Sequence, residues 1–142
     1  DITNAAIQKK KIGYMLQDYF LFPHFNVKNN LIFSLPKQTR NKQEQALDYL
    51  KKINMVEFSD HYPSELSGGQ KARIACLRAI ISNPEALLLD EPFSSLDKKT
   101  IKSFQKFLFD YVKKLNIPCV IVSHMLVKNL SNFIELNITK FT

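Results

Sequence analysis

Residues 66–70 read Leu-Ser-Gly-Gly-Gln. Ser67 and Gln70 have the spacing of a capping box, which predicts a helix that begins after Ser67 and runs to about Ser82. Two glycines in its first turn would each cost about 0.5–1 kcal/mol relative to alanine. Glycine is favoured there only where a ligand or another chain comes very close to the backbone, and the N–H groups of a helix start suit a phosphate. The alternative is an ordinary capped helix.

A second stretch, residues 86–92, reads Ala-Leu-Leu-Leu-Asp-Glu-Pro. Its apolar residues do not alternate with polar ones, which predicts a parallel strand covered on both faces. Asp90 and Glu91 follow at the C-terminal end, where ligands bind in open α/β sheets. Successive strand side chains point to opposite faces, so one carboxylate could hold a metal ion while the other handles a proton. A chance acidic turn after a strand is the alternative.

Three further stretches accompany these two. Gln17 ends a short strand predicted for 11–16, and an aromatic segment interrupted by proline follows it. Residues 94–97 read Ser-Ser-Leu-Asp. His124 follows a strand predicted for 119–122, at the same sheet edge as the two carboxylates. A lone histidine is more often structural, but its place at a strand end, together with the motif order of the family named below, favours a functional role.

Together these stretches resemble the nucleotide-binding domain of ATP-binding-cassette (ABC) proteins, from about residue 11 to about residue 129. In that family, Gln17 and the segment after it correspond to the Q-loop, and residues 66–70 to the signature motif. Residues 86–92 correspond to the Walker B motif, residues 94–97 to the D-loop, and His124 to the switch histidine. The resemblance implies an α/β fold, with a partial P-loop NTPase-type sheet core and an inserted helical subdomain. Residues 1–17 and 84–142 would form the core, and residues 18–83 would form the helical subdomain that carries the signature.

The resemblance also implies a role for each site residue. Glu91 would act as general base, His124 would contact the γ-phosphate of ATP, and Gln17 would sense the metal ion and the attacking water. Asp90, with Gln17, would hold Mg²⁺. The nucleotide-binding residues would be Ser67, Gly68, Gly69, Gln70 and Asp97, with the signature reaching ATP across a dimer interface that Asp97 shapes.

The aromatic segment resembles that of importers. The implied protein is therefore the ATPase subunit of an importer of a small solute, such as an oxyanion, a metal ion or a polyamine. Its partners would be a second nucleotide-binding domain, as a homodimer, and a membrane permease contacted through Tyr19–Phe25. It would work at the cytoplasmic face of the membrane. Two alternatives remain: a soluble ABC-type ATPase that acts on ribosomes or DNA, and a catalytically inactive remnant.

The Walker A pattern G-x-x-x-x-G-K-[ST] is absent from these 142 residues, whose three glycines are at positions 13, 68 and 69. That loop would supply the N–H groups and lysine that hold the phosphates. We therefore expect a fragment or a degenerate protein that hydrolyses ATP very poorly on its own. We also expect the strand at 86–89 to be short of neighbouring strands and the isolated chain to be marginally stable. The tail from Asn132 onward lacks the family's closing strands.

Composition argues against a nucleic-acid-binding site and against a membrane-spanning segment. The net charge is +7, but the lysines are scattered, which favours a solvated basic surface over a nucleic-acid site. No apolar run approaches the ~20 residues of a membrane span. Cys76 and Cys119 lie in apolar surroundings and are predicted to be reduced core residues.

Three more helices are predicted from caps and apolar spacing. One begins after Asn26 and ends near Leu35, and the next begins at Asn41. The apolar positions of that second helix are Ala46, Leu47, Leu50 and Ile53. A third helix follows the 94–97 stretch, with apolar positions Ile101, Phe104, Leu108, Tyr111, Val112 and Leu115.

Overall fold

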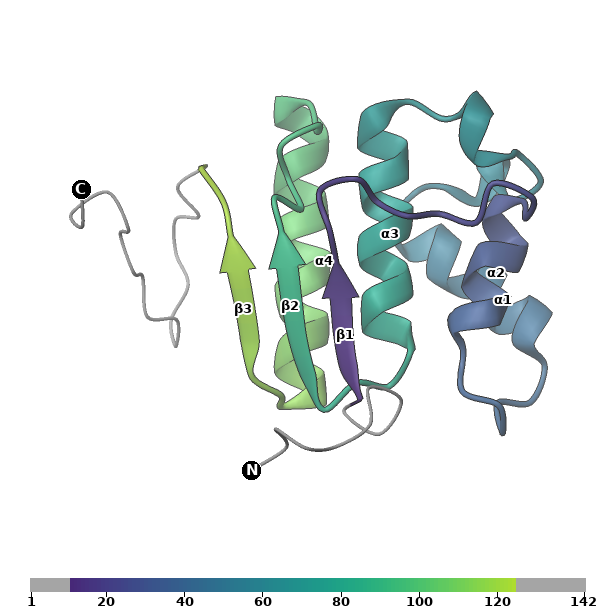
Figure 1. The fold of residues 1–142 in the computed structure, drawn as a ribbon, viewed down its shortest axis with the longest axis horizontal. Helices are drawn as coiled ribbons and strands as arrows, with labels where there is room; N and C mark the ends of the chain where they lie inside the picture. The colour runs from purple at the N-terminus through teal and green to yellow at the C-terminus, as the bar shows by residue number, and fades with distance from the viewer. Residues whose placement is uncertain (1–10, 125–142) are drawn as a thin grey trace.

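The computed structural model describes residues 11–124. Three parallel strands form one sheet in the order β1-β2-β3. The strands are β1 (Ile12–Met15), β2 (Ala86–Asp90) and β3 (Cys119–Val122). The α-helices are α1 (Val27–Ser34), α2 (Lys42–Lys52), α3 (Gly68–Ile81) and α4 (Lys98–Leu115), and two short 3₁₀ helices are η2 (Val56–Phe58) and η3 (Pro63–Glu65). Figure 1 shows α3 and α4 behind the sheet and α1 and α2 beside α3. The predicted α/β class and the three predicted strands are confirmed.

Strand β2 is the central strand of this sheet. Met15 of β1 lies opposite Leu89, and Val122 of β3 lies opposite Asp90. The expectation that this strand would be short of neighbouring strands is therefore wrong, because it is hydrogen-bonded along both edges. Strand order depends on contacts between distant segments, which the local sequence does not encode.

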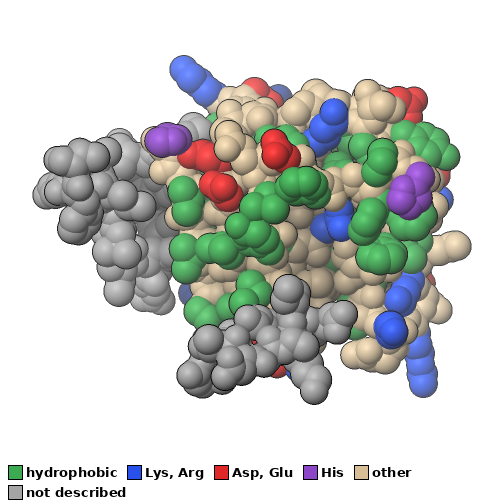
Figure 2. All heavy atoms as spheres, in the orientation of Figure 1, with side chains coloured by type: hydrophobic (Ala, Val, Ile, Leu, Met, Phe, Trp, Pro, Cys, Tyr) green, Lys and Arg blue, Asp and Glu red, His purple; other side chains and the backbone are tan. Residues whose placement is uncertain are grey.

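The two faces of the sheet differ. Leu87 and Leu89 are buried on the face that α3 and α4 cover. The opposite face carries the half-exposed side chains of Ile12, Tyr14, Val120 and Val122. Figure 2 shows this face as a band of hydrophobic side chains. Among residues 11–124 only one face is covered by helices, so the predicted burial of β2 on both faces is not met there.

The predicted helix boundaries agree closely with the structure. At the start of α3, Ser67 Oγ accepts from the Gln70 N–H at 3.3 Å, and Gln70 Oε1 accepts from the Ser67 N–H at 2.8 Å, which completes the predicted capping box. Asn26 caps α1 by accepting from the Asn29 N–H at 2.8 Å. Asn41 precedes α2 as predicted, but its side chain caps no N–H group.

The predicted apolar faces form the core. In α4, Ile101, Phe104, Leu108 and Val112 are buried. Helix α3 is buried on most of its surface because it lies between β1 and α1. Both cysteines are free, as predicted. Burial raises the pKa of both thiols, to about 11 for Cys119, which keeps them protonated near neutral pH.

Some predictions fall outside the described residues. These are the sheet-core assignments of residues 1–10 and 125–142, which include the divergent tail. Within residues 11–124, no helix is long and apolar enough to cross a bilayer.

Candidate functional site

Glu91 and His124 meet where β2 and β3 end. The Glu91 N–H donates to the Val122 carbonyl oxygen at 2.8 Å, which continues the pairing of the two strands. The Glu91 side chain is only 9% exposed. Its Oε1 accepts a 2.9 Å hydrogen bond from the main-chain N–H of His124. The structure therefore brings together two residues that lie 33 positions apart in the sequence.

The Glu91 backbone is strained, and its side chain is nearly buried, whereas the His124 ring is exposed. Glu91 has a φ of 48°, a left-handed conformation that costs energy for a residue with a side chain and that recurs at functional sites. The His124 ring is 98% exposed, with its Nε2 atom 3.5 Å from Glu91 Oε1. The nearly buried Glu91 carboxylate is therefore held in a fixed position, and the exposed His124 imidazole is accessible to a ligand.

Asp90 lies on the other side of the strand from Leu89 and is partly exposed. Figure 2 shows acidic side chains gathered beside a histidine at one end of the sheet. Among residues 11–124, no group of three or more acidic, histidine or cysteine side chains could hold a metal ion. Mg²⁺ does not need such a cage, because it usually keeps several waters and takes one or two carboxylates together with phosphate oxygens. Asp90 fits that donor set as a single ligand.

Gln17 follows the end of β1 and is exposed. Met15 of β1 lies opposite Leu89, and the three strands run parallel. The C-terminal ends of β1, β2 and β3 therefore share one edge of the sheet. The sequence predicted this common edge for the two carboxylates and His124, and the structure adds Gln17.

The glycine pair lies at the surface where α3 begins. Ser67 and Gly68 are exposed, and Gly69 and Gln70 are partly exposed. The first N–H groups of an α-helix have no partner within the helix, so those of the two glycines remain available to an anion. This arrangement keeps the signature motif accessible to a second molecule.

The close approach predicted at the glycines comes from within the chain. A Cβ atom on Gly69 would lie 2.5 Å from the Ser95 carbonyl oxygen, whereas one on Gly68 would lie no nearer than 3.5 Å to another heavy atom outside the helix. The sequence analysis assigned such an approach to a ligand or another chain. The structure corrects this for Gly69, because the turn at 94–97 already occupies that space.

Asp97 has a local role that the sequence analysis missed. It caps α4: Oδ1 accepts from the N–H groups of Lys99 at 3.0 Å and Thr100 at 2.9 Å, and Oδ2 accepts from the Thr100 hydroxyl at 2.7 Å. The Thr100 hydroxyl bond, followed by these N–H groups, lowers the pKa of the Asp97 carboxyl. An aspartate directly before a helix is a strong N-cap signal that could have predicted this.

The aromatic segment forms a packed cluster with an exposed rim. Phe22 contacts Phe25 and Phe33 edge to face, with ring centroids 5.6 and 4.7 Å apart. The Arg78 guanidinium lies over the Phe22 ring at 4.5 Å. Phe20 and Phe33 are 63% and 62% exposed. The segment is therefore both a small core and an aromatic surface, to which α1 contributes the unpredicted Phe33.

Asn30 is a second residue that the sequence analysis missed. Its side chain is fully buried. Oδ1 accepts from the Phe22 N–H at 2.9 Å, and Nδ2 donates to the carbonyl oxygens of Phe22, Phe25 and Asn26 at 3.1, 2.9 and 3.1 Å. One amide thus fixes the path of the aromatic segment. The only sequence signal is an asparagine beside the apolar positions of α1.

Comparison with known proteins relates this geometry to a family. The family model described as "ABC transporter" matches residues 1–94. The chain is 39% identical over 127 residues to a probable sulfate/thiosulfate import ATP-binding protein CysA from Chlorella vulgaris, covering 87% of this chain and 54% of that protein. It is 41% identical over 126 residues to a spermidine/putrescine import ATP-binding protein PotA from Oleidesulfovibrio alaskensis, covering 87% and 34%. The chain thus spans about half the length, or less, of these relatives.

Comparison with solved structures indicates the same family. The chain resembles an ATP-binding cassette solved as a dimer in a post-hydrolysis state with bound ADP and Pi. The TM-score is 0.73 at 30% identity, over 84% of this chain and 54% of that one. The predicted type of α/β fold is therefore confirmed. The chain belongs to the ABC transporter family.

Proposed function

We propose that this chain is part of an ATP-binding subunit that drives the import of a small solute through a membrane permease. The observation that carries the proposal is the Glu91 carboxylate, nearly buried at a strand end and held by the His124 N–H. A carboxylate in a fixed position suits a general base. The names of the relatives, ATP-binding proteins for the import of sulfate or thiosulfate and of spermidine or putrescine, support import of an oxyanion or a polyamine.

The proposed chemistry divides the site among its residues. Glu91 takes a proton from the attacking water, and the exposed His124 ring contacts the terminal phosphate of ATP. Asp90 and Gln17 would hold Mg²⁺, which would supply positive charge to neutralise the phosphates. Phosphoryl transfer depends mainly on positioning and electrostatic stabilisation. It can therefore use groups contributed by two molecules.

The signature completes the site from a second copy of the chain. The accessible start of that signature, Ser67, Gly68 and Gly69, supports contact with a phosphate held by the first copy, and Gln70 and Asp97 complete the proposed nucleotide-binding set. A homodimer gives two equivalent composite sites. The dimeric state of the solved cassette supports this assembly.

The permease contact lies on the proposed helical subdomain, residues 18–83. Its centre is Tyr19–Phe25, and the exposed rings of Phe20 and Phe33 support an apolar partner. The protein would act at the cytoplasmic face of the membrane. Because residues 1–142 lack the Walker A pattern, this chain by itself hydrolyses ATP very poorly.

The test starts from the protein produced from its own gene in its own cells. Solubilised membranes should yield this protein together with permease subunits, and the complex should hydrolyse Mg-ATP. Co-purification with ribosomes or DNA instead would favour the soluble ABC-type alternative. Permease association without nucleotide hydrolysis would favour the inactive remnant.

A further inference from the structure

Ser95 lies where three distant segments meet. Its carbonyl oxygen fills the space beside Gly69, where a Cβ atom would come within 2.5 Å. Its hydroxyl lies 2.6 Å from the hydroxyl of Tyr19, 76 positions earlier in the chain. The turn at 94–97 therefore touches the start of the signature helix on one side and the segment after β1 on the other.

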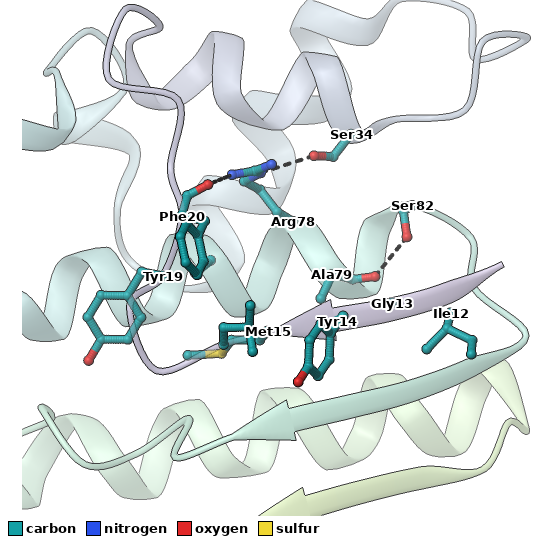
Figure 3. A pocket seen from close by; sticks show the side chains of 12 residues that line it. Ile12, Gly13, Tyr14, Met15, Tyr19, Phe20, Ser34, Arg78, Ala79 and Ser82 are labelled. Carbon is teal, nitrogen blue, oxygen red and sulfur yellow. Dashed lines mark hydrogen bonds between the residues drawn. The ribbon is translucent and has the colours of Figure 1, made fainter. Parts of the chain in front are cut away.

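The segment that carries Tyr19 is held in an unfavourable backbone conformation. Tyr19 has a φ of 62° and Phe20 a φ of 36°, values that large side chains adopt only when surrounding contacts impose them. One such contact comes from α3, where Arg78 donates to the Phe20 carbonyl oxygen at 2.8 Å. Figure 3 shows Arg78 reaching Phe20 from the helix, beside a cavity of about 220 Å³. The Tyr19 hydroxyl provides a second contact, to Ser95.

We propose that the Tyr19–Ser95 hydrogen bond is a positioning link that couples the aromatic segment, through the turn at 94–97, to the signature at Gly69. The inference rests on the proposed function, in which the aromatic segment contacts a permease and Gly69 belongs to the nucleotide site. Movement of Tyr19 would displace Ser95, and Ser95 cannot move toward Gly69 because the two backbones are already in contact. Tyr19 and Ser95 thus act through the signature rather than on ATP itself.

The strength of this link sets the expected size of the effect. A single exposed hydrogen bond formed in one of two states shifts the equilibrium between them by about fivefold. The measurable quantity is the ATPase rate of the permease-bound protein divided by the rate of the same protein free of permease. We call this quotient the coupling ratio.

The test measures the coupling ratio of the protein from its own gene, in complex with its permease, with Mg-ATP as the probe. Tyr19→Phe keeps the ring and removes one hydroxyl, and Ser95→Ala removes the other. Each variant should lower the coupling ratio about fivefold. The double variant should lower it no further, because both changes break the same bond.

A matched control removes a different hydroxyl pair. The Tyr49 and Tyr111 hydroxyls lie 3.0 Å apart between α2 and α4, away from Ser95. Tyr49→Phe should leave the coupling ratio unchanged, and an equal loss there would mean that any lost hydroxyl bond has this effect. That result would overturn the proposal.

Three other results would also overturn the proposal. One is an unchanged coupling ratio in both single variants, and another is a double variant whose losses multiply. The third is loss of permease co-purification by Tyr19→Phe but not by Ser95→Ala, because the hydroxyl would then contact the permease. If the parent protein neither binds a permease nor hydrolyses ATP, the proposed function fails and the link falls with it.

Discussion

The main-chain N–H of His124 donates a 2.9 Å hydrogen bond to Oε1 of Glu91, and this bond joins the ends of the two neighbouring strands β2 and β3. One oxygen of the carboxylate is thereby held in place by the backbone. The imidazole of the same histidine stays exposed. The position of the proposed base thus depends on the backbone of the sheet edge, and the histidine ring lies beside the same oxygen at 3.5 Å.

Glu91→Gln should retain ATP binding and lose most turnover in the complete protein with its permease. Glutamine keeps an oxygen that can accept from the His124 N–H, but it cannot take a proton from water, which should cost about 10²–10⁴-fold in kcat. Glu85→Gln is the control, because Glu85 is an exposed carboxylate paired with Lys11 at the other end of β2. Steady-state ATPase rates and nucleotide binding check the prediction, and an undiminished kcat would remove Glu91 as the base.

The two signature glycines should respond differently to alanine. In Gly69→Ala the new Cβ atom would meet the Ser95 carbonyl oxygen at 2.5 Å, and the shift required should cost about 1–3 kcal/mol of stability. Gly68→Ala meets only an ordinary contact at 3.5 Å and gains helix propensity, so its stability should be unchanged or higher. Urea denaturation of both variants tests this. Equal losses would show that Ser95 does not account for the glycine at position 69.

Local patterns predicted those parts of the site that depend on local chemistry. The capping box at Ser67 and Gln70 and the strand ends at Glu91 and His124 follow from a few consecutive residues. The common edge also followed, because parallel strands bring their C-terminal ends together. These features account for most of the candidate site residues.

The remaining features depend on contacts between distant segments. The hydroxyls of Tyr19 and Ser95 are 76 positions apart, and no periodicity indicates that they meet. The burial of Asn30 depends on how the aromatic segment folds over α1. The central place of β2 depends on the order of the strands in the sheet. Sequences with the same apolar pattern could arrange their strands in another order. The sequence therefore predicted the helices and strands better than the contacts between them.

Asn30→Ala should destabilise the fold by about 2–4 kcal/mol. The change leaves the partly buried N–H of Phe22 and the carbonyl oxygens of Phe22 and Phe25 without their partner. Asn29→Ala is the matched control, since Asn29 is exposed on the same helix and should change stability by less than about 0.5 kcal/mol. Equilibrium urea unfolding measures both. A loss in Asn30→Ala no larger than the control's would contradict the role given to the amide.

One face of the sheet, which no helix of residues 11–124 covers, should cause the isolated chain to self-associate. Tyr14, Val120 and Val122 present apolar side chains on this face, and Val120 is 56% exposed. Val120→Lys should lower the average mass in sedimentation equilibrium, because it places a charge at the centre of β3. Val56→Lys changes an apolar residue of η2 that is 37% exposed and lies outside the sheet, so it should leave association unchanged. If both substitutions act alike, net charge rather than this face controls association.

The cap at Asp97 should make stability depend on pH in acid. The Thr100 hydroxyl and the N–H groups of Thr100 and Lys99 lower the pKa of Asp97 below its ordinary value of 3.8. A carboxyl whose pKa is lowered by folding stabilises the fold above the pKa of the unfolded chain, and this stabilisation is lost as pH falls through the pKa of the folded state. Asp97→Asn should therefore be less stable than the parent at pH 7, and the difference should shrink below about pH 4. Thermal or urea unfolding from pH 7 to pH 2 measures this, and a constant difference between Asp97→Asn and the parent over that range would refute the charged cap.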